Sequence, residues 1–206
     1  MRSSALALVF LLALPGCEAI ERTLERHRLI HSIVPEHAGR AVKVQSRPTT
    51  LGSVSAKKIT LGTAAVISED TLITAAHVAR DSEGRPLDVM YVDPTGRGRC
   101  WLPARVVRYV DGPVEPIAVL VAELAPPDQL LGFHGWPVED RYVIGGSGAA
   151  PHAVETRRGP YRWTVGRIRP GDSGSPVVDS AGRLVGLAWG TYGPHPVFLP
   201  VFARDF

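Results

Sequence analysis

Gly171-Asp172-Ser173-Gly174-Ser175-Pro176 is the stretch that decides the fold and the chemistry of this 206-residue chain. A serine between two glycines is typical of a tight turn, on which its hydroxyl is free of flanking Cβ atoms. Backbone N–H groups of such a turn can point together at an oxygen atom that gains negative charge during a reaction. The stretch therefore presents an accessible Ser173 hydroxyl beside a set of hydrogen-bond donors.

A second motif, Leu72-Ile73-Thr74-Ala75-Ala76-His77-Val78, places a histidine at the end of an apolar strand. The small residues before His77 allow the chain to turn sharply and to present the imidazole at that strand end. His77 is therefore the second candidate for a chemical role.

Together the two motifs resemble those of the chymotrypsin/trypsin-like serine protease family, in particular its bacterial, disulfide-free members. The resemblance extends from about Leu61 to the C-terminus and keeps the family's order, with the histidine before the serine. It implies that His77 is the general base for the nucleophile Ser173, and that the N–H groups of Gly171 and Ser173 form the oxyanion hole. Ser175 stands where the family often has a glycine.

The third residue of the family's catalytic triad is not in its expected place. The family has an aspartate directly before an apolar strand, which here is Ile117-Ala118-Val119-Leu120, and the residue before it is Pro116. Loss of that acid lowers kcat about 10⁴-fold in a related enzyme. Glu115 is predicted to replace the acid, with Asp111, or no carboxylate at all, as the alternatives.

Two functional hypotheses follow. The first is an exported serine endopeptidase that cleaves peptide bonds through an acyl-enzyme, with Ser173 as nucleophile and His77 as general base. The second is a catalytically impaired pseudoprotease that binds extended peptides, because Pro116 occupies the usual position of the triad acid. The first predicts a peptide or protein substrate that is cleaved, and the second a peptide that is only held.

The resemblance also implies a substrate-binding strand at Leu187-Ala188-Trp189-Gly190, whose backbone pairs with the substrate as an added strand. Gly190 would keep the wall of the primary pocket open. Arg167 is predicted to lie near the base of that pocket, where it would favour an acidic or polar side chain. In the alternative interpretation, Arg167 points to solvent among neighbouring arginines.

The rest of the chain predicts an all-β protein of two antiparallel β-barrels of the chymotrypsin-like type, with an N-terminal helix. Residues 17–40 read as a helical tether, 41–124 as the first barrel with His77, and 125–206 as the second barrel with Ser173. We find no internal repeat. Strands are predicted at 41–46, 63–67, 71–74, 89–92, 105–110, 117–121, 141–144, 161–165, 176–178, 184–188 and 197–201.

Residues 1–16 are predicted to be a signal peptide, because one positive charge precedes an apolar run too short to span a bilayer. The run ends in Leu14-Pro15-Gly16-Cys17, which resembles a bacterial lipobox and predicts lipidation of Cys17. The localisation predicted is the bacterial cell envelope, lipid-anchored, or the secreted fraction. In the alternative, ordinary cleavage nearby, for example after Ala19, leaves a free protein.

The composition predicts few other partners. A net charge of +3 and a pI near 9.1 are only mildly basic, and no run of Lys and Arg indicates nucleic-acid binding. His134, His152 and His195 lack metal-ligand spacing, so neither a metal nor a cofactor is predicted. The domain is expected to be a monomer, and to contact a membrane only through a lipid on Cys17.

Overall fold

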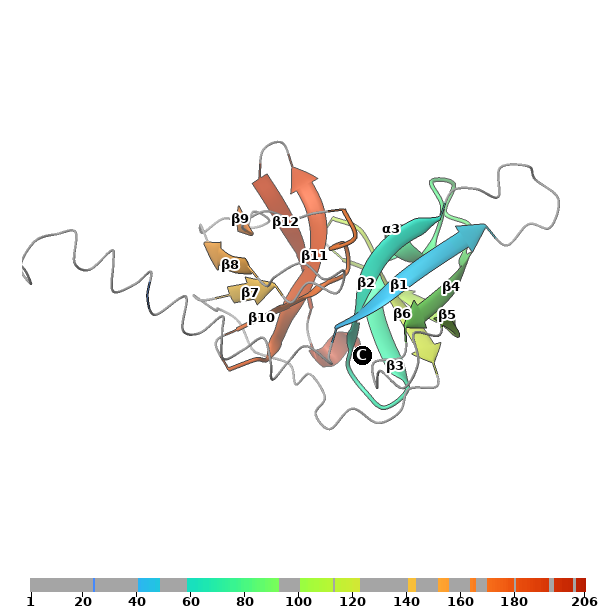
Figure 1. Ribbon diagram of the computed structural model, residues 1–206, viewed down its shortest axis with the longest axis horizontal. Helices are drawn as coiled ribbons and strands as arrows, with labels where there is room; N and C mark the ends of the chain where they lie inside the picture. Colours follow the sequence, from blue (N-terminus) through green and yellow to red (C-terminus); the bar gives the residue numbers. More distant parts are fainter. Residues whose placement is uncertain are drawn as a thin grey trace, which may run out of the picture.

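The computed structural model describes Leu24 and residues 41–48, 59–92, 101–112, 114–122, 141–143, 152–155, 164–165, 170–179, 181–192, 195–201 and 203–206. Its strands form two bodies that lie side by side, one from each half of the chain (Figure 1). The predicted signal peptide, Cys17 and the predicted tether lie outside the described residues, except for Leu24, which is helical and exposed. No helix in the described part of the chain is long and apolar enough to cross a bilayer.

The first body is a closed antiparallel barrel with the strand order β1-β2-β3-β6-β5-β4. A single helical turn, α3 (Ala76–Ala79), follows the third strand and carries His77. The predicted first barrel is therefore confirmed, and its second and third strands pair as a hairpin. The strands are β1 (Ala41–Pro48), β2 (Thr60–Val66), β3 (Thr71–Ala75), β4 (Leu87–Val92), β5 (Trp101–Val110) and β6 (Ile117–Ala122).

Burial explains why apolar and polar residues do not alternate along β3. Leu72 and Ile73 point to opposite faces of the strand, yet both are fully buried. One face of β3 fills the barrel interior, and β3 also contacts β11 of the second body. The strand that leads to His77 is therefore held from both sides.

The second body is a six-stranded antiparallel sheet with the order β12-β11-β10-β7-β8-β9. Its outer strands β9 and β12 contact one another without pairing in the part of the chain that the structure describes, so the predicted second barrel is observed as a curled sheet. The two described residues of β9 pair with β8, a strand that was not predicted. The strands are β7 (Arg141–Val143), β8 (His152–Glu155), β9 (Thr164–Val165), β10 (Pro176–Val178), β11 (Leu184–Tyr192) and β12 (His195–Pro200), followed by η2 (Ala203–Asp205).

Each body contains a turn of the same sequence pattern, Asp-Ser-x-Gly-Arg, at residues 81–85 and 179–183. In both turns Oδ1 of the aspartate accepts the N–H groups two and four residues later, and the arginine Nε donates to Oδ2. Gly84 and Gly182 have φ values of 80 and 73, which favour glycine. The two bodies therefore share a local turn motif of five residues, which is too short to be an internal repeat.

The two turns differ in burial, which predicts different stability effects. Asp179 is 2% exposed and accepts three hydrogen bonds, so Asp179→Ala removes a buried acceptor and should lower the free energy of unfolding by about 2 kcal/mol. The Asp81 side chain is 23% exposed, so in Asp81→Ala water can bond to the N–H groups that lose their acceptor. Asp81→Ala is therefore the matched control, with a smaller loss of unfolding free energy. Urea unfolding of both variants checks this, and equal losses would contradict it.

Candidate active site

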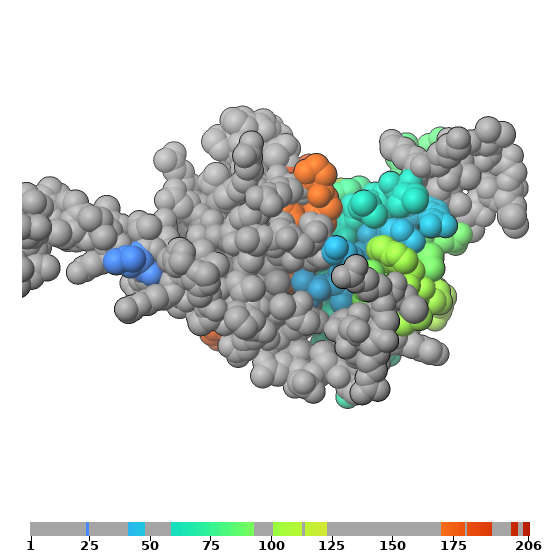
Figure 2. Space-filling model, viewed as in Figure 1, coloured from blue at the N-terminus to red at the C-terminus, as the bar shows by residue number. Residues whose placement is uncertain are grey.

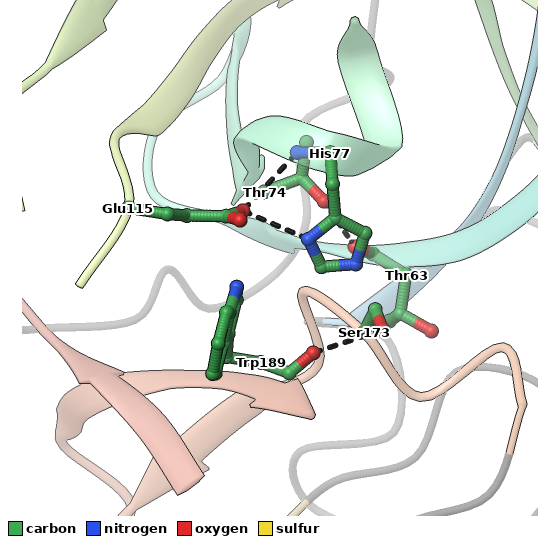
Figure 3. A network of polar contacts seen from close by, with 6 residues as sticks. All are labelled: Thr63, Thr74, His77, Glu115, Ser173 and Trp189. Atoms are coloured by element: carbon green, nitrogen blue, oxygen red, sulfur yellow. Dashed lines mark hydrogen bonds and ion pairs between the residues drawn. The ribbon is translucent and has the colours of Figure 1, made fainter. Parts of the chain in front are cut away.

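The strand register brings His77 and Glu115 together. Strands β3 and β6 are antiparallel with Ala75 opposite Ile117, and the next N–H along, that of Ala76, donates to the carbonyl of Pro116 at 3.1 Å. One further step along both chains places His77 opposite Glu115. Figure 3 shows the Glu115 side chain extended toward the imidazole from the loop before β6.

The Glu115 carboxylate meets three donors. Its Oε1 lies 2.8 Å from Nδ1 of His77 and accepts the backbone N–H of His77 at 3.1 Å. The indole N–H of Trp189, on β11, also points toward this carboxylate. Burial raises the pKa of Glu115, but the hydrogen bonds from the His77 and Trp189 side chains and the charge of His77 outweigh burial and hold that pKa below its ordinary value.

A tight loop allows Glu115 to reach this place. A Cβ atom on Gly112 would lie 2.3 Å from the carbonyl oxygen of Glu115, so only glycine lets the loop fold this closely. Asp111, the alternative acid, is exposed at the end of β5 and has no contact with His77 among the described residues. The structure thus brings Glu115 and not Asp111 to the imidazole.

The Ser173 turn is built as the glycines indicated. Gly171 and Gly174 have φ values of 95 and 85, the left-handed region that side chains rarely adopt. The carbonyls of residues 171, 172 and 173 each accept a hydrogen bond from the protein. The amides of Gly174 and Ser175 donate to Ala188 and Asp172, whereas those of Gly171 and Ser173 have no acceptor among the described residues.

The Ser173 hydroxyl lies beside His77 without a hydrogen bond to it. Figure 3 shows the imidazole nitrogen that faces away from Glu115 on the Ser173 side. The hydroxyl instead donates to the carbonyl of Trp189 at 3.2 Å, long for an O–H···O bond. Such hydrogen bonds are often poorly formed before substrate binds, and a rotation about the Cα–Cβ bond of Ser173 would redirect this one.

Comparisons with known proteins identify the family of this chain. The sequence profile described as trypsin-like peptidase domain matches residues 62–187. The chain belongs to the trypsin-like peptidase family. A comparison of the sequence with curated proteins found no match.

Solved bacterial proteases share the fold of this trypsin-like peptidase domain. The active form of the Rv3671c protease from M. tuberculosis is 23% identical, with a TM-score of 0.63, and the match covers 84% of this chain and 80% of that one. A serine endoprotease from Yersinia pestis is 17% identical, with a TM-score of 0.60, and the match covers 85% of this chain and 62% of that one.

The predicted substrate strand lies beside the Ser173 turn. The backbone of Ala188 pairs with Gly174 and Ser175, so the strand is anchored there. From Gly190 to Tyr192, β11 pairs with β12 on one side and has no other partner strand in the described part of the chain. No described atom lies within 4 Å of a Cβ built on Gly190, which leaves open space there, while Arg167 lies outside the described residues and its place stays a prediction.

Sequence analysis missed the contacts that join the two bodies at this site. Thr63 bonds to the Ser173 turn, and Trp189 contacts Glu115, although Trp189 was considered only as part of the substrate strand. Both contacts link residues far apart in the chain, and no local pattern marks them. Among the described residues, no group of three metal-ligating side chains was found.

The lowered pKa of Glu115 predicts a pH-dependent stability. Because the folded protein favours the charged carboxylate, this contribution is present above the ordinary pKa of 4.5 and is lost as pH falls through the lower folded value. The difference in unfolding free energy between wild type and Glu115→Gln should therefore shrink between about pH 6 and pH 3. Urea titrations measure it, with the exposed Glu69→Gln as control, and a constant difference would contradict the account.

Proposed function

We propose that this trypsin-like peptidase is an active serine endopeptidase with Ser173, His77 and Glu115 as its triad. The observation that carries the proposal is the 2.8 Å contact between Nδ1 of His77 and Oε1 of Glu115. A carboxylate on this nitrogen fixes the tautomer that leaves the other ring nitrogen free to accept a proton, and it stabilises the imidazolium that forms. Glu115 thereby supplies what Pro116 cannot.

The proposed reaction is acyl transfer to Ser173. The hydroxyl oxygen bonds to the peptide carbonyl carbon as its proton passes to Nε2 of His77. His77 then gives that proton to the leaving nitrogen, the C–N bond breaks, and an ester on Ser173 remains. Water, deprotonated by His77, attacks the ester and releases the acid with return of the proton to Ser173.

The hydrogen-bond pattern of the Ser173 turn supports an oxyanion hole at Gly171 and Ser173. All three carbonyls of residues 171–173 already accept hydrogen bonds, so none is free to turn into the site. The amides of Gly171 and Ser173 are the ones left without an acceptor in the described part of the turn. Two fixed donors at a developing oxyanion lower the barrier far more than mobile water does.

The free side of β11 supports binding of an extended peptide. A substrate strand could hydrogen-bond to the backbone from Gly190 to Tyr192, where β11 lacks a second partner strand among the described residues. In strand addition of this kind, most hydrogen bonds are made to the substrate backbone, so it suits an endopeptidase. The open space at Gly190 would then receive a substrate side chain.

Peptide hydrolysis by purified variants tests the proposal. Ser173→Ala should abolish turnover, and Glu115→Gln should lower kcat by about 10²–10⁴-fold with a smaller effect on KM, because the acid acts on the transition state. Asp111→Asn is the matched control, since this exposed carboxylate has no contact with His77 among the described residues, and should match wild type. Equal kcat for Glu115→Gln and wild type would overturn the role of Glu115.

The pseudoprotease remains the competing function because one observation favours it. The Ser173 hydroxyl donates to Trp189 and not to His77, as in a site that is not primed for attack. The same assay separates the two hypotheses. A folded wild-type protein that binds extended peptides without any turnover would support the binding module and overturn the endopeptidase.

We also propose export to the bacterial cell envelope with a lipid on Cys17, which rests on the sequence of residues 1–17 alone. Labelling with a fatty-acid probe in a bacterial host should mark wild type and leave Cys17→Ser unlabelled. Equal labelling of both proteins would overturn the anchor and leave a secreted enzyme as the alternative.

A further inference from the structure

Thr63 of the first barrel holds the Ser173 turn of the second body at two points. Its hydroxyl donates to the carbonyl of Gly171 at 2.8 Å. Its backbone N–H donates to the carbonyl of Ser173, also at 2.8 Å. Thr63 lies on β2 and is fully buried, so water does not compete for either bond.

The same residue is bonded to the strand that carries the histidine. The carbonyl oxygen of Thr63 accepts the hydroxyl of Thr74 at 2.6 Å. Thr74 lies on β3, shortly before His77, and is fully buried as well. Figure 3 shows the Thr74 side chain directed at Thr63 next to the imidazole, with Ser173 beside Thr63.

The Ser173 turn packs closely against β2. A Cβ on Gly62 would lie 2.6 Å from Cγ1 of Val78 and 3.1 Å from the carbonyl oxygen of Ser173. A Cβ on Gly174 would lie 2.0 Å from the carbonyl oxygen of Thr63. Figure 2 shows the orange segment around the turn in direct contact with the cyan strands of the first barrel. Glycine on both sides therefore lets the two backbones meet.

We propose that Thr63 is a positioning residue, whose hydroxyl fixes the oxyanion-hole amides relative to His77; the proposal rests on the endopeptidase function above. Gly171, in the left-handed region at φ 95, has no side chain to hold its flanking peptide planes. The Thr63 hydroxyl supplies this constraint by holding the Gly171 carbonyl. Without it the peptide between Gly171 and Asp172 can rotate. This peptide unit joins the two units that carry the Gly171 and Ser173 N–H groups, so the direction of one donor relative to the other is no longer fixed.

A positioning role differs in its kinetics from a structural one. Donors aimed at the oxyanion act on the transition state, so their displacement lowers kcat and leaves KM nearly unchanged. A general loosening of the fold would weaken substrate binding as well. Binding of a peptidyl trifluoromethyl ketone, which forms an oxyanion adduct with a catalytic serine, should weaken in parallel with kcat/KM.

The test compares Thr63→Val, which keeps the shape and removes the hydroxyl, with Thr63→Ser, which keeps the hydroxyl. Thr63→Val should lower kcat by about 10- to 100-fold, less than the full loss of an oxyanion donor, with KM within about threefold of wild type. Thr63→Ser should recover kcat to within about threefold of wild type. The pH dependence of kcat/KM should be unchanged in both, because the contact of His77 with Glu115 is intact.

Thr71→Val is the matched control, because its hydroxyl bonds to Asp70 at the opposite end of β3 from His77. The kcat and KM of Thr71→Val should match those of wild type. Wild-type kcat in Thr63→Val, equal losses in Thr63→Val and Thr63→Ser, or a rise in KM at constant kcat would each overturn the proposal. If Thr63→Val does not fold, Thr63→Ala takes its place with the same expectations. Failure of Thr63 alone leaves wild-type turnover intact, whereas absence of wild-type turnover overturns the endopeptidase and this inference together.

Discussion

The antiparallel register of β3 and β6 is the constraint on which the site depends. Because Ala75 lies opposite Ile117, His77 just after β3 and Glu115 just before β6 lie next to one another. The register is held by the pairing that runs from Thr71 opposite Val121 to Ala75 opposite Ile117, and by the hydrogen bond from the Ala76 N–H to the Pro116 carbonyl. A carboxylate one position before the family's usual one can therefore still meet the imidazole.

The second constraint is the contact of β2 with the turn that bears the serine. The turn is tied to β2 by hydrogen bonds from Thr63 and to β11 by the pairing of Gly174 with Ala188. Neither body holds the whole candidate site, because His77 and Glu115 come from one and Ser173 from the other. Trp189, which contacts both Glu115 and Ser173, lies where these two sets of residues meet.

Local sequence predicted the pieces of this site better than their arrangement. The two motifs located His77 and Ser173 on a strand end and a glycine turn, because small residues and glycines have a direct conformational meaning. The choice between Glu115 and Asp111 stayed open, since it depends on which residue the register places opposite the histidine. The sequence gives no sign of the hydrogen bonds of Thr63, because they join residues that are distant in the chain. Curling of the second sheet likewise depends on how its outer strands meet.

Covalent labelling tests the central claim, that folding unites an imidazole, a serine hydroxyl and two free amides. A fluorophosphonate reacts with a serine whose proton can be removed and whose adduct oxygen is held by such donors. The account predicts one label on Ser173 in the folded wild type, found by mass spectrometry of its peptides, and none in His77→Ala. A folded wild-type protein that stays unlabelled while a reference serine protease reacts, or a label on another residue, would contradict it.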